Sequence, residues 1–485
     1  MQYPGLVGPA YQSASYMADC EELINLYIEK NETPNAPSPY CLLPTPGFAE
    51  LLVVPEGPIR GEIGAVNGRG FFVAGFRVYE AFFNPVTGLW TAVARGTVAS
   101  DANPATLCWN GPNGGELFIT SGDVGYILTL ATNVLTVVLP SGATMGAFLD
   151  GYFLALDAST ATLRISDLLD GLTWDPTQIA QRTAGADPWI AMTVLHREIW
   201  LQGGQTSEVW YNAGSFPFPF APIQGAFLEQ GIAAPFSANR DVAPLVWLSS
   251  NAQGTRMVLM SQGYTGQRVS THAIEQAITR YAVVSDAVSF GYQEDGHTFY
   301  VLSFPTEDVT WTYDVTEGAW GKRGYWDTTT STYEALRVFT HAMMFDQHVV
   351  GDRATGTLYR QGLDLFTDVD EAAIRRLRQP PRITAGQKRI SVQSVQLVMD
   401  VGIGLSGTSA TQGFDPQVMR RCSRNGGKTW GPEKWTSAGK LGEYNIRVVW
   451  QPCGQARNYV DQFIFTDPVP FRVSDAEIEL TVGTS

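Results

Sequence analysis

A weak internal repeat across residues 63–370 is the feature that most constrains how this chain can fold. Short apolar runs recur there, and most are followed after a polar turn by a second run. The runs lie 36 to 57 residues apart and occupy 68–76, 114–122, 150–158, 197–204, 254–263, 296–304 and 347–352. A period of about 45 residues with paired strands is typical of propeller blades. The repeat therefore predicts an all-β protein built on a β-propeller of six or seven blades.

The turns inside the repeat share a pattern, Asn/Asp-x-x-x-Gly-x-Trp, that resembles the turns of kelch-type blades. It is marked by Asn84, Gly88 and Trp90, and again by Asp314, Gly318 and Trp320. The segment 167–174 repeats it with one inserted residue. Asn or Asp begins such a turn by accepting hydrogen bonds from nearby amides, and Gly accepts a positive φ. The Trp then packs its ring on the returning strand, so we interpret these residues as structural turn markers.

Composition agrees with a turn-rich β protein. Charged residues make up only 16% of the chain, while 49 Gly, 28 Pro and 12% aromatic residues are present. We expect few helices: one inserted at 270–282 inside the propeller, and a second at 368–381 that ends at two prolines. Residues 1–62 contain a Pro-rich stretch, which predicts an extended N-terminal arm. Alternating segments after residue 370 predict a small antiparallel β-sandwich at 371–485.

No signature of catalysis or of a cofactor site emerges. The chain lacks GxSxG, HExxH, a P-loop and a GxGxxG that opens a helix. His297 and its acidic neighbours in 296–320 fit strand and turn positions better than a catalytic cluster. His341 and His348 are the closest histidine pair, but an odd spacing along one strand puts them on opposite faces. We expect no catalytic residues, no metal site and no cofactor.

The five cysteines are far apart and free of CxxC spacing. This pattern argues against a disulfide framework and a zinc site, and favours folding in a reducing cytosol. The N-terminus lacks the pattern of a signal peptide, and no run of about 18 apolar residues occurs. We therefore expect no membrane insertion.

Charge is unevenly distributed. Residues 371–457 hold 14 Lys/Arg and 5 Asp/Glu, whereas residues 1–370 hold 17 basic and 37 acidic residues. Two interpretations of this basic region are equally good: it is a solvated face of the C-terminal domain, or it contacts an acidic partner or phosphate. The candidate contacts are Arg375, Arg376, Arg378, Arg382, Lys388 and Arg389.

The segment 423–430, SRNGGKTW, fits the Asp-box pattern of sialidase propellers. Asn425 and Gly427 would form its tight turn, and Trp430 would brace it. The box occurs once and outside the repeat, so a hairpin brace is the favoured interpretation. It nevertheless keeps open an alternative function, that of a carbohydrate-binding or sialidase-like propeller protein.

The long motif GYQEDGHTFYVLSFPTEDVTWTYDVTEGAW (291–320) resembles a hallmark of the packaged-DNA stabilisation proteins, the tail-nozzle or tail-hub proteins of short-tailed phages. Shorter matches include FLEQGIAAP (227–235), QRVSTHAIEQAI (267–278), SDAVSFGYQ (285–293) and DPVPFRVSDAEIEL (467–480).

The resemblance implies a structural role without catalytic residues. Members form a hexameric ring below the portal and adaptor rings, extend the DNA channel, retain packaged DNA and anchor tailspikes or tail fibres. Some also hold a tail needle. It implies a virion-tail location after assembly in the host cytoplasm, with double-stranded DNA in the lumen and no sequence-specific binding.

Overall fold

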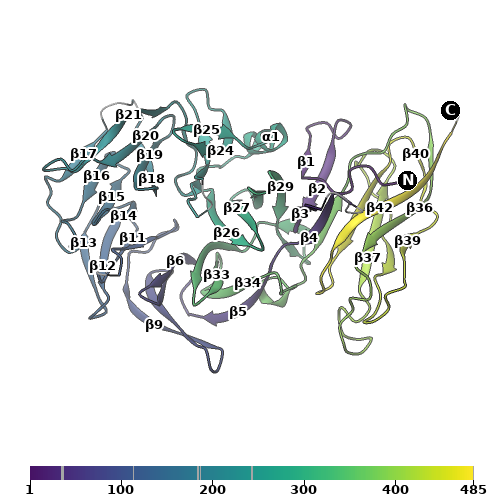
Figure 1. Cartoon of the computed structure of the whole chain (residues 1–485), viewed down its shortest axis with the longest axis horizontal. Coiled ribbons are helices and arrows are strands. Elements are labelled where there is room, and N and C mark those ends of the chain that lie inside the picture. Colours follow the sequence, from purple (N-terminus) through teal and green to yellow (C-terminus); the bar gives the residue numbers. More distant parts are fainter. Residues whose placement is uncertain (34–37, 113, 183–184, 186, 242–243, 484–485) are drawn as a thin grey trace.

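The computed structural model describes residues 1–33, 38–112, 114–182, 185, 187–241 and 244–483. These residues form a β-propeller followed by a β-sandwich, which confirms the all-β fold class predicted from the sequence (Figure 1). Within them the propeller has seven antiparallel four-stranded blades, at the upper end of the predicted range. Part of the Pro-rich stretch, 34–37, lies outside the described residues.

The blades follow one another along the chain. Blades 1 to 3 consist of β6 (Ile59–Val66), β7 (Arg69–Ala74), β8 (Arg77–Asn84) and β9 (Leu89–Thr97); β10 (Thr106–Trp109), β11 (Glu116–Ser121), β12 (Val124–Thr129) and β13 (Val134–Leu139); and β14 (Met145–Leu149), β15 (Tyr152–Asp157), β16 (Thr162–Ile165) and β17 (Ile179–Gln181). Blades 4 and 5 consist of β18 (Trp189–Leu195), β19 (Glu198–Gly203), β20 (Ser207–Asn212) and β21 (Phe220–Leu228); and β22 (Gly231–Ile232), β23 (Val246–Ser250), β24 (Arg256–Gln262) and β25 (Thr265–Arg268). Blades 6 and 7 consist of β26 (Val288–Glu294), β27 (His297–Phe304), β28 (Val309–Asp314) and β29 (Ala319–Arg323); and β32 (Val338–Met344), β33 (Gln347–Asp352), β34 (Thr357–Gly362) and β5 (Gly47–Val53).

The apolar runs that revealed the repeat are the second strands of six blades. All residues of β11, and almost all of β7, β15, β19 and β27, are buried, because these strands are covered on both faces by neighbouring blades. In blade 5 the run at 254–263 is instead the third strand, β24, and the second strand is β23. This one displacement accounts for the longest interval in the repeat.

The ring is closed by the N-terminal part of the chain. β5 pairs antiparallel with β34 and so supplies the outermost strand of blade 7. The innermost strands of blades 1 and 7 then pack against each other, with Gly64 of β6 directly against the carbonyl of Met343 in β32. Residues 1–62, which the sequence predicts to be an extended arm, hold β1 to β5 and the start of β6 and are thus built into both domains.

Helices are few, as predicted. α1 (His272–Arg280) forms where the sequence predicts one, and the hydroxyl of Thr271 caps it by accepting from the amide of Ile274. Short 3₁₀ turns occur at η1 (Pro235–Ser237) and η2 (Val369–Glu371). The helix predicted at 368–381 is wrong: after η2 the chain forms β35 (Arg376–Gln379). β35 is hydrogen-bonded along both edges, and that pairing outweighs the local helical preference.

The sandwich has two sheets. One contains β1 (Tyr11–Gln12), β2 (Cys20–Ile24), β35, β41 (Val460–Phe465), β37 (Gln417–Ser423) and β38 (Lys434–Ser437). The other contains β3 (Leu26–Lys30), β4 (Tyr40–Pro44), β42 (Val473–Val482), β36 (Ile390–Met399), β39 (Val448–Trp450) and β40 (Gly454–Ala456). Their shared core holds Trp450, Phe463 and Phe471. Residues 371–485 alone do not complete this sandwich, because β1 to β4 belong to the N-terminal segment.

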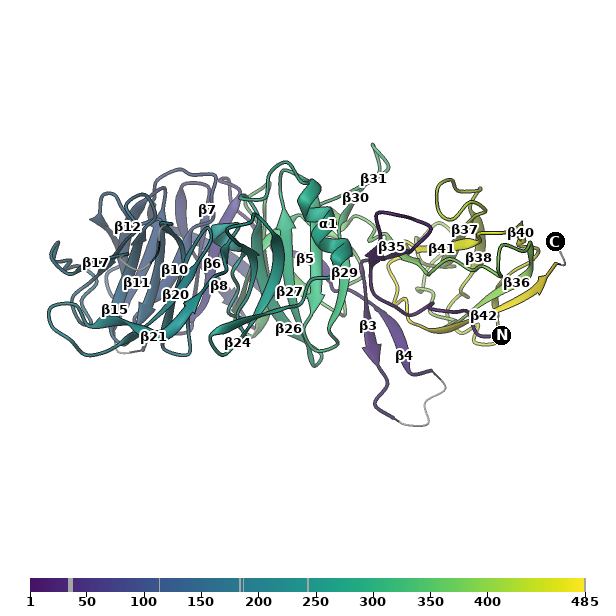
Figure 2. The same cartoon turned by 90° about the horizontal axis from the view of Figure 1, so that it is seen from above.

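A single sheet joins the two domains. β2 pairs antiparallel with β35 of the sandwich and parallel with β29 of blade 6, through Ile24 and Lys322. Blade 6 is thereby continuous with the sandwich sheet. Figure 2 shows the β3–β4 hairpin projecting from one side of this junction and the hairpin of β30 (Tyr325–Asp327) and β31 (Thr332–Glu334) from the other. In the described parts of the chain, no helix is long and apolar enough to cross a membrane.

Candidate functional site

The turn markers are held by side-chain hydrogen bonds within the propeller. The Asn84 Oδ1 accepts from the amides of Val86 and Thr87, at 3.0 and 3.3 Å. Asp314 does the same for Thr316 and Glu317, at 2.9 and 3.3 Å. Gly88 and Gly318 have φ values of +70° and +66°. Trp90 and Trp320 are buried, and the Trp320 ring lies 4.9 Å from that of Tyr313.

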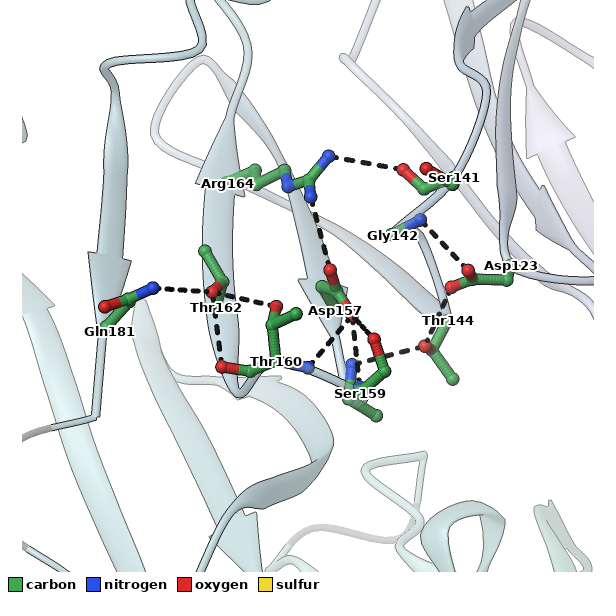
Figure 3. A network of polar contacts seen from close by, with 11 residues as sticks. Asp123, Ser141, Gly142, Thr144, Asp157, Ser159, Thr160, Thr162, Arg164 and Gln181 are labelled. Carbon is green, nitrogen blue, oxygen red and sulfur yellow. Dashed lines mark hydrogen bonds and ion pairs between the residues drawn. The ribbon is translucent and has the colours of Figure 1, made fainter.

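Related turns occur that lack the Gly-x-Trp part of the pattern and were missed from the sequence. In blade 3 the Asp157 carboxylate accepts from the amides of Ser159 and Thr160 and pairs with Arg164 at 3.2 Å (Figure 3). Arg164 also reaches the carbonyl of Ser141 in the connection from blade 2. An Asp followed by Ser or Thr two residues later is the signal that could have found this turn. Such networks lock neighbouring blades together.

The Asp-box segment is a braced turn. The Ser423 hydroxyl accepts from the amide of Gly427 at 2.9 Å, and the Asn425 Oδ1 accepts from the amides of Lys428 and Thr429. The Trp430 ring lies under a guanidinium group, that of Arg421, at 5.2 Å. The side chains of Ser423, Asn425 and Thr429 thus hold the turn.

Two of the six basic candidates are buried, and their prediction as surface contacts is wrong. Arg376 is 0% exposed and donates to the carbonyl of Asp467 at 3.4 Å; burial lowers its pKa to about 10. Arg378 is 1% exposed and donates to the N-terminal segment at Gly5, Leu6, Pro9, Glu21 and Glu22. These side chains point into the sandwich because β35 is an interior strand with both faces covered.

The other four candidates lie nearer the surface. The Arg382 guanidinium is held by Asn458 and by the carbonyl of Met17. Arg375 is 11% exposed and stacks on Trp326 at the junction between the domains. Lys388 and Arg389 are exposed at the end of the loop that enters β36. The six basic residues therefore form no common patch.

The propeller axis contains a cavity of about 650 Å³, lined by the innermost strands of the blades. We call it the axial cavity. Glu62 of β6 lies in its wall with both carboxylate oxygens buried, next to the hydroxyl of Thr340. Burial raises the pKa of Glu62 to about 8, so its carboxyl group is protonated at neutral pH.

The two histidines expected on opposite faces in fact meet. His341 lies on β32 and His348 on β33, and the hairpin brings Nε2 of the first within 2.9 Å of Nδ1 of the second. The prediction of opposite faces is wrong because the chain reverses between Met344 and Gln347, so the two histidines lie on different strands. Burial and the charge of His348 lower the pKa of His341 to about 3. The described residues hold no group of three or more His, Cys, Asp or Glu side chains that could hold a metal ion.

Two family profiles match the sequence. The profile described as bacteriophage P22 Gp10, beta-propeller, spans residues 18–363, and the profile described as bacteriophage P22 Gp10, beta-sandwich, spans residues 376–481. The chain belongs to this family. As a member, it is a structural phage protein of the tail-hub and DNA-stabilisation type. No curated protein matches it in sequence.

Similarity to solved structures is low. A streptogramin B lyase has a TM-score of 0.41 at 8% identity over 66% of this chain and 98% of that one. PorZ of Porphyromonas gingivalis has a TM-score of 0.35 at 11% identity over 72% of this chain and 45% of that one. The extracellular domain of BT3049 from B. thetaiotaomicron has a TM-score of 0.41 at 8% identity, covering 81% and 48%. At these values the similarity says nothing about the function of this chain.

Proposed function

We propose that six copies of this chain form the tail nozzle of a short-tailed phage, a ring that extends the DNA channel below the portal and adaptor. The observation that carries the proposal is the family match, which runs through both the propeller and the sandwich. The continuous sheet through β2 supports it, because a subunit that transmits load in a virion benefits from domains that cannot rotate against each other.

In this proposal the DNA passes between copies and not through one propeller. The axial cavity of about 650 Å³ is the size of a small-molecule pocket, far too small for a duplex. Residues 1–370 carry 37 acidic and 17 basic side chains, so a lumen lined by them would repel DNA. Tight DNA binding needs many Lys and Arg contacts with phosphates, and a channel that DNA must leave has no use for them.

The partners we propose are the portal-adaptor ring, tailspike or tail-fibre proteins and, in phages that carry one, a tail needle. The exposed Lys388 and Arg389 are candidates for contact with acidic surfaces of these proteins. Assembly would take place in the host cytoplasm, where the five free cysteines stay reduced.

Native mass spectrometry and negative-stain microscopy of the purified chain, with and without its adaptor ring, test the oligomeric state. We expect closed rings of six, either alone or nucleated by the adaptor. A chain that stays monomeric at all concentrations and does not bind the adaptor would refute the nozzle.

The retention of DNA is tested separately with virions assembled without this chain. Packaged heads should then release DNA, and adding the purified chain before release should prevent it. Clear turnover of a polysaccharide or sialoside by the purified chain would instead support the carbohydrate-active alternative.

A further inference from the structure

A second cavity lies where the propeller meets the sandwich. It has a volume of about 690 Å³ and opens between the β30–β31 hairpin and one face of the sheet that joins the domains. β2, β29, β35, β37 and β41 all contribute to its lining. We call it the junction cavity. None of the residues that line it belongs to the turn markers described above.

The floor and one wall of the junction cavity are apolar or aromatic. Ile24 and Leu377 line the cavity and form a small buried cluster with Met419 and Ile464, against which Tyr333 packs. The Tyr333 ring meets Trp326 edge to face at 4.9 Å, and its hydroxyl donates to the carbonyl of residue 375 at 3.2 Å. The hairpin is therefore fixed over the sheet and makes a permanent wall.

Two arginines bring positive charge to this apolar setting. The Arg375 guanidinium stacks on Trp326 at 4.2 Å, and that of Arg421 on Trp430 at 5.2 Å. Arg421 donates from Nε to Gln462, whereas Nε of Arg375 is buried without a hydrogen-bond partner among the described residues. Burial and the nearby charge of Arg375 both lower the pKa of Arg421. Two guanidinium groups that line one cavity and repel each other favour an anion between them.

Within the chain, the Glu433 carboxylate is only a weak ion-pair partner of Arg375. The Glu433 carboxylate lies 3.8 Å from the Arg375 guanidinium, beyond hydrogen-bond distance, and stays 32% exposed. An incoming carboxylate can displace it without breaking a hydrogen bond. Glu22, Asp308 and Glu334 also line the cavity, and the cationic side chains of Lys322 and Arg323 balance part of their charge.

We propose that the junction cavity binds the carboxylate side chain of an acidic peptide segment from a partner protein, between Arg375 and Arg421. The planar carboxylate suits the fork of a guanidinium, and the aliphatic stem of a glutamate suits the aromatic wall and apolar floor. The proposal does not depend on the hexameric nozzle, because it concerns a site complete within one chain.

Isothermal titration calorimetry of the full chain with a blocked tetraglutamate peptide tests this site, and a blocked tetraglutamine peptide is the control ligand. We expect saturable binding of tetraglutamate only. Arg375→Met and Arg421→Met should each weaken it by about tenfold or more, because each removes one guanidinium–carboxylate contact. Lys30→Met removes an exposed basic residue of β3 that lies outside the cavity, and it should leave binding unchanged.

The variant Glu433→Gln distinguishes a ligand-binding role of the two arginines from a purely structural one. Removing the internal carboxylate that competes for Arg375 should tighten tetraglutamate binding several-fold, and it keeps the shape of the side chain. It also tests the site should either arginine variant fail to fold.

The proposal is overturned if tetraglutamate does not bind at millimolar concentration, if tetraglutamine binds equally well, or if Glu433→Gln weakens binding. Binding of inorganic phosphate or of a short DNA duplex at least as tight as that of tetraglutamate, and lost in Arg375→Met, would assign the site to phosphate instead and refute the peptide. These outcomes do not depend on whether the chain forms a hexamer, because the cavity lies within one chain.

Discussion

Replacing Arg378 by methionine should release the N-terminal segment from the sandwich. The buried guanidinium donates to the carbonyls of Leu6 at 2.5 Å, Gly5 at 2.7 Å, and Pro9 and Glu22 at 3.3 Å, and it pairs with Glu21 at 2.5 Å. Methionine keeps the length and apolar volume of the stem but removes all five contacts.

The expected cost is about 4 kcal/mol. Removing one partner of a buried ion pair costs about 3–5 kcal/mol, because the other charge stays buried without compensation. The Glu21 carboxylate is 12% exposed, so partial hydration relieves some of this penalty, whereas four carbonyls lose a charged donor and add to it. Glu21→Gln combined with Arg378→Met should recover part of the loss, since no buried charge then remains.

Hydrogen exchange measures this loss locally, which suits a two-domain chain whose global unfolding is not a single transition. The amide of Tyr3 donates to Ala476 and that of Ala10 to Trp320, both at 2.7 Å, so both report on docking of the segment. A loss of about 4 kcal/mol corresponds to roughly thousandfold faster exchange at these amides. Lys388→Met is the control. Less than about a tenfold change in Arg378→Met would refute the assignment of Arg378 as the main anchor.

Three further predictions concern the propeller. Burial raises the pKa of Glu62 to about 8, so the stability of the native chain should fall as pH rises from about 4.5 to about 8. Glu62→Gln should remove this pH dependence and be more stable than the native chain at alkaline pH, by at most about 5 kcal/mol. Equal melting profiles of the two proteins across this pH range would contradict the prediction. The hydrogen bond to Asp314 at 2.7 Å raises the pKa of His297 above 6.5, so their pairing stabilises fully at acidic pH and is lost as pH rises through the raised value. His297→Asn should therefore lower the Tm more at about pH 5.5 than at about pH 9, and a uniform loss would rule out the charged pair. Gly64→Ala should lower the free energy of unfolding by about 3 kcal/mol or more, measured by thermal unfolding, because its Cβ would overlap the carbonyl of Met343 in blade 7. Gly204→Ala is the control and should be neutral, because a Cβ at Gly204 lies in open space.

Local sequence patterns predicted the structure correctly where it depends on contacts between residues close in the sequence. The second strands of the blades are visible as apolar runs because both of their faces are covered, and α1 is visible from its cap and its buried face. Turns that begin with Asn84 and Asp314 follow from side chains that bond their own backbone two or three residues on. The same reasoning failed at 368–381, where partners far along the chain decide the structure.

The sequence by itself determined the class of fold, because the repeat, the turn residues and the alternation each reflect contacts between near neighbours. Only the tertiary structure decided which residues are surface and which are anchors. β2 lies more than 350 residues from β35, yet their pairing buries Arg378 and turns a candidate for phosphate contact into the tie that holds the N-terminus. Likewise Arg375 and Arg421 become neighbours only because the sheet carries both strands to one face. Charge patterning along the chain cannot reveal such contacts, since burial depends on which strands pair and not on the residues alone.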